Sequence, residues 1–240
     1  MNTVLFDLDG TLLPIENKVF FHEYMSKIAK KFSQFGYEPD RFIKALIAGT
    51  DAMIANDGQM KNEERFWKVF SSLLGEKILD YEDEFEAFYQ NEFNEIRKAA
   101  NPNPSAKKCV QILKDKGYTL VAATNPVFPA IATRQRIDWA QLNADDFDLI
   151  TTFENSNFCK PNLDYYRMIL NQLGKDASDC MMVGNDVDED LCAADIGMQT
   201  YLLSDYVINP AMKDISMIPQ GSFEDLYRYF LTLPKAEPVI

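Results

Sequence analysis

Residues 4–12 read VLFDLDGTL, a short apolar run that ends at two aspartates, Asp7 and Asp9, separated by one leucine. Residues 2–6 have the length and composition of a buried strand that would end at Asp7. Side chains i and i+2 of a strand point the same way, so both carboxylates could address one ligand at the strand end. Gly10 would let the backbone turn sharply directly after them. The segment therefore predicts a buried strand with a pair of carboxylates at its carboxyl end.

The second half of the chain alternates between short apolar runs and amphipathic helical patterns. Strands are expected at 118–124, 147–153, 180–184 and 199–203, and helices at 105–117, 127–136, 163–174, 187–197 and 222–233. Such alternation predicts a parallel sheet with helices on both faces. With residues 2–7 as one more strand, the expected fold class is α/β, with a Rossmann-like parallel-sheet core.

Residues 16–100 have a different character, because they carry apolar residues at helical spacing throughout. Four helical stretches are expected, at 19–35, 41–54, 62–74 and 82–100. Their breaks contain Gly, Pro, Asn and Asp, which favour turns. The predicted organisation is a core domain made of residues 1–15 and 101–240, interrupted by a helical cap domain at 16–100.

Composition and charge exclude several classes of function. The chain has 240 residues, 47% of them hydrophobic, and a formal net charge of −13, which argues against general binding to nucleic acid or anionic membranes. The N-terminal residues have neither a basic stretch nor a long apolar run, so no signal peptide or membrane span is expected. With a single histidine, His22, a zinc site is not expected. The four cysteines are scattered without a Cys-x-x-Cys pair, which predicts a cytoplasmic protein; they are Cys109, Cys159, Cys180 and Cys192. Cys109, Cys180 and Cys192 lie in apolar-periodic stretches and are expected to be buried free thiols.

Polar and charged residues follow each predicted strand, where parallel sheets bind their ligands. These residues are Asp7, Asp9, Thr124, Asn125, Lys160, Asn185, Asp186 and Asp190. Together they offer a nucleophile, a proton carrier, phosphate donors, a cation and metal ligands, which is the set that phosphoryl transfer requires.

This ordered set resembles the four motifs of the haloacid dehalogenase (HAD) superfamily. The matching residues are Asp7-Leu8-Asp9-Gly10-Thr11-Leu12, Thr124, Lys160-Pro161 and Gly184-Asn185-Asp186 with Asp190. The resemblance covers essentially the whole chain, and the helical run lies where type C1 members carry a helical cap. It implies a HAD-like fold and a magnesium-dependent phosphatase that cleaves a small phosphorylated metabolite.

The resemblance also implies a role for each matching residue. Asp7 would attack phosphorus and form an aspartyl-phosphate, while Asp9 would act as general acid and base. The phosphate-binding residues would be Gly10, Thr124, Asn125 and Lys160. Magnesium would be held by the Asp7 side chain, the Asp9 backbone carbonyl and Asp186.

Motif four departs from the usual pattern, in which the glycine is followed directly by aspartate. Here Asn185 intervenes, so either Asn185 or Asp186 corresponds to the usual ligand. We favour Asp186, with Asn185 as a neighbouring candidate and Asp190 supporting the ligands from behind.

Other interpretations stay open at this point. A sugar-phosphate mutase would keep the same motifs, and a catalytically silent phosphate-binding protein would keep the fold. A signalling receiver domain also carries phosphate on an aspartate, but it normally lacks a long helical insertion. The identity of the substrate and the oligomeric state are not fixed by the sequence.

Residues of the cap would select the substrate. The polar loop around 56–62 supplies the candidates Asn56, Asp57, Lys61 and Asn62, although a solvated turn is the favoured interpretation. His22 is expected to be a partly buried packing residue rather than a substrate contact. Aromatic residues at helical spacing should form the core of the cap; they are Phe20, Phe21, Tyr24, Phe66, Trp67, Phe70, Phe85 and Phe88.

Overall fold

A single parallel sheet lies at the centre of the core of the molecule. The computed structural model describes residues 1–236. The strands are β1 (Thr3–Phe6), β2 (Thr119–Ala122), β3 (Leu149–Ile150), β4 (Cys180–Gly184), β5 (Gln199–Leu203) and β6 (Gln220–Gly221). Their order in the sheet is β3-β2-β1-β4-β5-β6, and every neighbouring pair is parallel. The predicted α/β class and its five strands are confirmed, while β6 is too short and polar to stand out in the sequence.

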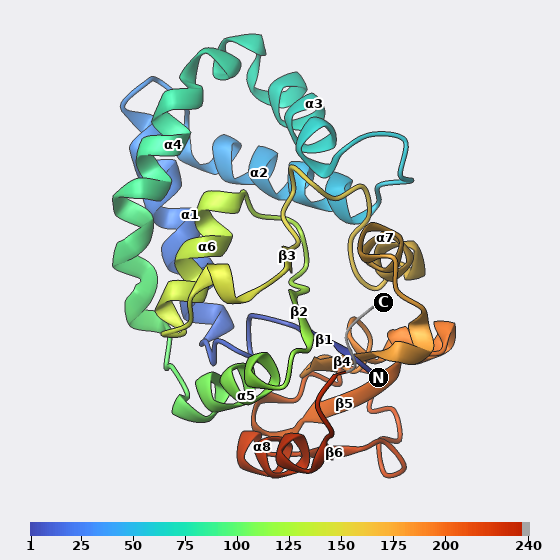
Figure 1. The fold of residues 1–240 in the computed structure, drawn as a ribbon. Coiled ribbons are helices and arrows are strands. Elements are labelled where there is room, and N and C mark those ends of the chain that lie inside the picture. The colour runs from blue at the N-terminus through green and yellow to red at the C-terminus, as the bar shows by residue number, and fades with distance from the viewer. Residues whose placement is uncertain (237–240) are drawn as a thin grey trace.

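Helices cover both faces of the sheet. Successive residues of each strand point to opposite faces, so the strands pack against helices on both sides. Val4 and Phe6 of β1 face a core shared with α5 (Pro104–Asp115), α6 (Ala130–Trp139) and α8 (Phe223–Thr232). Leu5 faces the other way, toward α7 (Leu163–Leu173) and the 3₁₀ helix η5 (Leu191–Ile196). Figure 1 shows α5 and α8 side by side at the bottom of the view, with α7 on the right.

A helical insert, residues 16–100, lies between β1 and α5. It contains α1 (Asn17–Ser33), α2 (Pro39–Ile54), α3 (Asn62–Leu74), η1 (Glu76–Tyr81), α4 (Glu82–Gln90) and η2 (Glu92–Ala99). Its two ends meet, since Glu16 N donates to Ala99 O at 3.1 Å and Asn101 N donates to Pro14 O at 2.8 Å. In Figure 1 the insert, coloured blue to green, forms the upper and left part of the molecule. The division of the chain into separate core and cap domains stays a prediction.

Aromatic side chains fill the core of the insert. The ring of Phe32 lies 4.9 Å from that of Phe42 and 4.0 Å from that of Phe85, measured between centroids. All three side chains are buried, as are most of the aromatics expected here. Trp67 is only partly buried. Phe21 is 52% exposed, so its assignment to the core is wrong. Phe21 lies on the side of α1 that faces a cavity, described below.

The segment 187–197 was expected to be a regular helix, and the structure corrects this. The Asp186 carboxylate accepts hydrogen bonds from the backbone N–H groups of Asp188 and Glu189, both at 2.8 Å. These bonds fold the start of the segment into a turn, so only the 3₁₀ helix η5 follows, and Gly197 ends it with a φ of +93°.

Two further expectations concern thiols and membranes. Cys109 and Cys180 are buried free thiols as predicted, and Cys159 is buried too. Cys192 is only half-buried, so its predicted burial is wrong. Among the helices of residues 1–236, none is long and apolar enough to cross a membrane.

Phe32→Ala should lower the free energy of unfolding by about 3 to 5 kcal/mol, because it opens a cavity among closely packed rings. The matched control is Leu79→Ala on the exposed surface of η1, which should change it by less than about 0.5 kcal/mol. Urea unfolding followed by circular dichroism measures both. Equal effects of the two substitutions would contradict the assigned aromatic core.

Candidate active site

A buried lysine brings three distant segments together at the carboxyl edge of the sheet. The ammonium of Lys160 lies 2.9 Å from Asp7 Oδ1, directly after β1, and 2.7 Å from Asp190 Oδ1, beyond β4. Lys160 is only 1% exposed. Taking this charge out of water is unfavourable unless it is paired, and here two carboxylates pair with it.

The ionisation of this cluster follows from its burial and its charges. Burial alone would lower the pKa of Lys160, but the carboxylates of Asp190 and Asp7 together raise it well above its ordinary value. Burial also raises the pKa of Asp190 to about 7, against the opposing effect of Lys160. Lys160 therefore stays protonated and positively charged beside Asp7.

Gly184, at the end of β4, makes room for the Asp190 carboxylate. A Cβ atom on Gly184 would lie 2.0 Å from Asp190 Oδ2. The same carboxylate oxygen accepts a hydrogen bond from Asp186 N at 3.0 Å. Asp190 thus connects Lys160 to the backbone of the turn after β4. Its expected role in supporting metal ligands stays a prediction.

Asp9 is paired with a residue that the sequence did not reveal. Arg136 on α6 is 1% exposed, and its guanidinium forms an ion pair and hydrogen bond with Asp9 Oδ2. Its guanidinium carbon lies 4.4 Å from the centroid of the Phe128 ring, a cation–π arrangement. Burial raises the pKa of Asp9 above its ordinary value, and Arg136 opposes that change. Asp9 Oδ1 is buried and has no hydrogen-bond partner among the described residues.

The turn after Asp9 packs directly on Asn185. Gly10 has a φ of +86°, and a Cβ atom there would lie 2.5 Å from Asn185 Nδ2. Thr11 Oγ1 donates to Asn185 Oδ1 at 2.9 Å, and Asn185 Nδ2 donates to Tyr206 O at 2.8 Å. Asn185 thus faces the Asp7–Thr11 segment, whereas Asp186 caps its own turn.

Thr124 and Asn125 lie at the end of β2, as the sequence predicted. Thr124 is buried, and its carbonyl accepts from Thr151 Oγ1 at 2.7 Å. Asn125 Oδ1 accepts from Lys160 N at 3.2 Å, while Asn125 Nδ2 donates to Glu189 Oε2 at 3.1 Å. The two loops that carry Thr124 and Lys160 are therefore tied together.

Several backbone groups at this edge are available to a ligand. The N–H groups of Leu8, Asp9 and Asn125 donate to no residue within 1–236. Together with the Lys160 ammonium they can bind an anion, since successive unpaired N–H groups suit phosphate oxygens. The sequence did not reveal that the N–H groups of Leu8 and Asp9 could bind an anion, because almost every residue type carries the same backbone N–H.

The polar loop of the insert docks on the core, contrary to the solvated turn favoured above. Asn62 is fully buried, and its Nδ2 donates to Pro126 O at 3.2 Å and to Cys159 Sγ at 3.3 Å. Asn56 Nδ2 donates to Asn62 Oδ1 at 2.8 Å. Lys61 Nζ also bonds to the core, 2.9 Å from Asn157 Oδ1.

The remaining insert candidates lie at the surface. Asp57 is exposed and pairs with Arg65 at 2.9 Å. His22 is exposed rather than partly buried, so its expected packing role is wrong.

Comparison with known proteins decides the family. A sequence model described as haloacid dehalogenase-like hydrolase matches residues 1–195. The chain belongs to this family. The predicted membership of the HAD superfamily is thereby confirmed.

Curated relatives and solved structures agree with this assignment. A phosphoglycolate phosphatase of Aquifex aeolicus is 26% identical over 191 residues, which cover 80% of this chain and 78% of the relative. A glyceraldehyde 3-phosphate phosphatase of Methanothermobacter thermautotrophicus is 23% identical over 186 residues, 70% of this chain and 80% of the relative. The crystal structure of a HAD phosphatase from Thermococcus onnurineus has a TM-score of 0.61 at 22% identity, covering 98% of this chain and all of its own. The last likeness shows that the fold is shared.

Metal ligands in this HAD-like hydrolase would be oxygen atoms. No group of three His, Cys, Asp or Glu side chains within the described residues is arranged to hold a metal ion. A metal site that also uses a main-chain carbonyl oxygen does not need three such side chains. Asp7 Oδ2 and the Asp9 carbonyl accept no hydrogen bond from residues 1–236, so both are free for a cation. These oxygens fit magnesium, which prefers carboxylate and carbonyl ligands.

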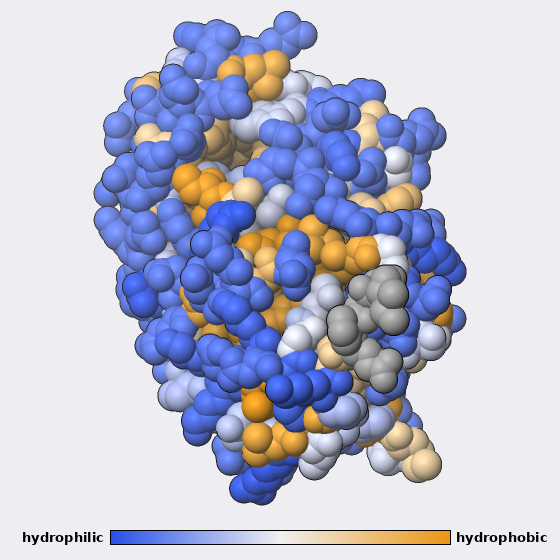
Figure 2. Space-filling view, viewed as in Figure 1, coloured by the Kyte–Doolittle hydropathy of each residue, from blue (hydrophilic) through white to orange (hydrophobic). Residues whose placement is uncertain are grey.

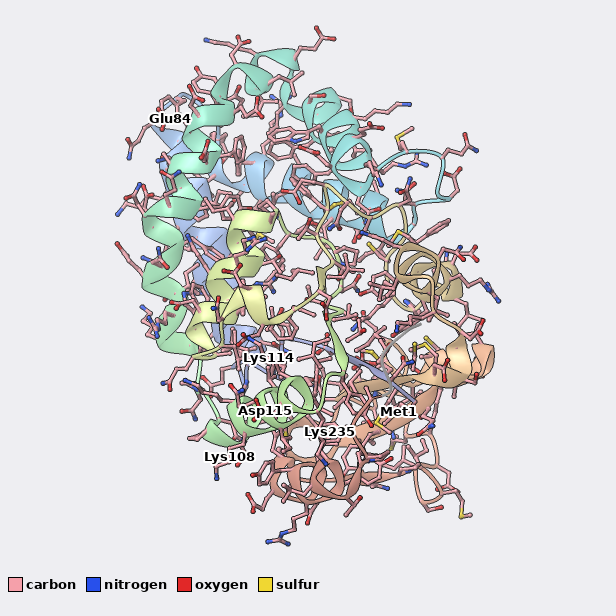
Figure 3. All side chains as sticks on the ribbon, viewed as in Figure 1. Met1, Glu84, Lys108, Lys114, Asp115 and Lys235 are labelled. Carbon is pink, nitrogen blue, oxygen red and sulfur yellow. The ribbon has the colours of Figure 1, made fainter. Side chains whose placement is uncertain are left out.

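Lys160→Met should lower the free energy of unfolding by about 3 to 5 kcal/mol at pH 8 in EDTA, because it leaves buried carboxylates without a cation. The control is Lys114→Met, whose residue Figure 3 labels at the end of α5 and which pairs with Asp146 at the surface. Exposed pairs contribute about 0 to 1 kcal/mol. Urea titrations of both variants check the difference, and a stable Lys160→Met protein would contradict the paired, buried ammonium.

Proposed function

We propose that this hydrolase is a magnesium-dependent phosphatase of small phosphorylated metabolites. The observation that carries the proposal is the placement of Asp7, the Lys160 ammonium and unpaired backbone N–H groups at one sheet edge. A carboxylate beside a fixed cation and anion-binding donors suits attack on a phosphate ester. The named activities of the relatives, which include a ribulose-1,5-bisphosphate 5-phosphatase of Halopiger xanaduensis, support the same substrate class.

In the proposed reaction a carboxylate oxygen of Asp7 attacks phosphorus. The bond between phosphorus and the ester oxygen breaks, and Asp9 gives its proton to the leaving alkoxide. A water molecule then attacks the aspartyl-phosphate, and the Asp9 carboxylate takes a proton from it. Orthophosphate leaves, and Asp7 and Asp9 return to their starting states. The raised pKa of Asp9 supports this role, because burial favours the protonated form that the first step needs.

Lys160, Thr124 and Asn125 would hold the phosphoryl group during both steps. The Lys160 ammonium would pair with the phosphoryl oxygens as well as with Asp7. The Thr124 hydroxyl and the Asn125 N–H would donate to the other oxygens. Gly10 would let the backbone after Asp9 turn sharply beside this group, and it also leaves room for the Asn185 side chain, with which a Cβ atom there would collide.

Arg136 would act as a positioning residue for Asp9. Its guanidinium holds one carboxylate oxygen and is itself fixed by the Phe128 ring. The other oxygen, Oδ1, is left without a partner among the described residues and is free for proton transfer.

Magnesium would be held by Asp7, by the Asp9 carbonyl and by Asn185 or Asp186. Bound there, the ion would offset the negative charge of the phosphoryl oxygens beside the Asp7 carboxylate. Of the two open candidates we favour Asn185 on its position, because its side chain packs against Gly10 and accepts a hydrogen bond from Thr11 Oγ1. The Asp186 carboxylate instead accepts two hydrogen bonds from its own turn. A Bacillus subtilis HAD hydrolase of the same fold, YfnB, is described as bound to magnesium, at a TM-score of 0.52 and 19% identity.

Asp7→Asn should reduce kcat by at least about 10³-fold, because the nucleophile is lost. Asp9→Asn should reduce it by about 10²- to 10⁴-fold through loss of proton transfer. Release of orthophosphate from glycerol 2-phosphate with magnesium measures both, because its alkoxide leaving group needs a proton. Activity of Asp7→Asn at the level of the parent would refute the assigned nucleophile, and the absence of turnover in the parent would indicate a silent binding protein.

Arg136→Met should lower kcat by about 10- to 100-fold with little change in KM, because misplacing a catalytic group is costly. The matched control, Arg134→Met, removes an arginine from the exposed side of the same helix and should leave kcat unchanged. The same assay checks both. Equal rates for the two variants would contradict the positioning role.

Asn185→Ala should raise the magnesium concentration needed for half-maximal rate by about tenfold or more, since it removes a ligand oxygen. Asp186→Ala should have a smaller effect in magnesium titrations of the EDTA-treated enzyme. The reverse order would assign the ligand to Asp186.

A further inference from the structure

An aromatic cavity of about 370 Å³ lies between the helical insert and the core. Its walls come from α1, α2, α3, α4 and the start of α6, and its aromatic lining comprises Phe20, Phe21, Tyr24, Phe66, Trp67, Phe85, Tyr89, Phe128 and Phe153. Figure 2 shows a recess in the upper half of this face, with pale and orange surfaces below a blue rim. The volume is in the range of small-molecule sites.

The cavity adjoins the proposed proton carrier. Phe20 and Phe21 line it and also line a separate depression beside Asp9. From the other side, Phe128 lines the cavity and packs against Arg136, which is paired with Asp9. An alkoxide protonated by Asp9 would therefore leave beside this aromatic space.

The charged lining of the cavity is entirely acidic. Glu63, Glu82, Glu86 and Glu154 line it, whereas no Lys, Arg or His does so in the described chain. Glu154 Oε1 accepts from Ala130 N at 2.8 Å, but Glu154 Oε2 is buried and has no partner among residues 1–236. Burial, and then the nearby Glu154 and Glu82, raise the pKa of Glu63. The lining itself holds no cation to pair with these carboxylates. Arg136 packs behind Phe128 and is paired with Asp9, and Lys18 lines the depression beside Asp9.

We propose that this cavity receives an organic cation carried by the leaving group, so that the substrate is a phosphate monoester of an amino alcohol. The inference rests on the proposed phosphatase function. Aromatic faces attract ammonium and quaternary ammonium groups, and carboxylates add a direct charge attraction. A leaving group with a carboxylate, such as that of phosphoglycolate, would instead meet four negative side chains.

Three esters of similar size separate charge from shape. Phosphocholine carries a quaternary ammonium, 3,3-dimethylbutyl phosphate is its uncharged isostere, and phosphoglycolate carries a carboxylate. We expect kcat/KM for phosphocholine to exceed that of the isostere at least tenfold and that of phosphoglycolate by a larger factor. Equal values for the first two esters, or the highest value for phosphoglycolate, would overturn the proposal.

A substitution in the cavity tests the origin of the preference. Glu154→Gln keeps the shape and removes one charge, and the ratio of kcat/KM for phosphocholine to that of its isostere should fall about fivefold. Glu84→Gln is the control, because Glu84 lies on α4 outside the cavity lining and is labelled at the outer edge of the insert in Figure 3. A ratio equally altered in both variants, or unchanged in Glu154→Gln, would contradict the role of Glu154.

Binding gives a readout that does not depend on turnover. Trp67 lines the cavity, so its fluorescence in the Asp7→Asn variant should respond to choline at concentrations at least tenfold lower than to 3,3-dimethylbutanol. Loss of the fluorescence response in a Trp67→Phe variant would show that the response comes from Trp67. If glycerol 2-phosphate is not hydrolysed, the proposed phosphatase function is wrong. The proposed cation site is then tested by choline binding alone. Equal affinity for the two alcohols would overturn that site.

Discussion

The arrangement of the site depends on the buried ammonium of Lys160. Burial of a single cation is costly, so the fold must supply carboxylates within hydrogen-bond distance. Asp7 reaches it from the end of β1 and Asp190 from the turn after β4. One charge therefore fixes the relative positions of three strand ends. Removal of Lys160 would leave two buried carboxylates without a cation, whereas removal of either carboxylate would leave the ammonium paired with the other.

A second buried pair connects the chemistry to the helical insert. Arg136 holds Asp9 on one side and stacks on Phe128 on the other. Phe128 in turn packs against Phe20 and Tyr24 of α1, with ring centroids 5.9 and 5.3 Å away. Asp9, the proposed proton carrier, is thus held by a chain of contacts that begins in the insert. In the proposed reaction the insert would therefore both lie beside the leaving group and orient the acid that protonates it.

Much of this could be predicted because it follows from short-range patterns. The apolar run before Asp7 marks β1, and the rule that parallel strands present their carboxyl ends at one edge places Lys160 and Asp190 beside it. The insert followed from helical spacing of its apolar residues.

What escaped prediction depends on three-dimensional packing. Arg136 lies in an ordinary helical pattern, and nothing in its sequence neighbours shows that it points inward at Asp9. The docking of Asn62 was missed because its partners, Pro126 O and Cys159 Sγ, are far away in the sequence. The turn at Asp186 replaced the first part of an expected helix because a side chain competed for backbone donors.

Asn62 connects the helical insert to two loops at the carboxyl edge of the sheet. Its amide group spans the gap between the loop just after Asn125 and the loop just before Lys160. Asn62 N and Glu63 N add bonds to Ser156 O and Phe153 O, at 2.8 and 3.0 Å. Each such bond contributes about 0.5 to 1.5 kcal/mol. A movement of α3 away from the sheet would break these bonds together. If the insert opens to admit a substrate, the loops proposed to hold the phosphoryl group would loosen at the same time.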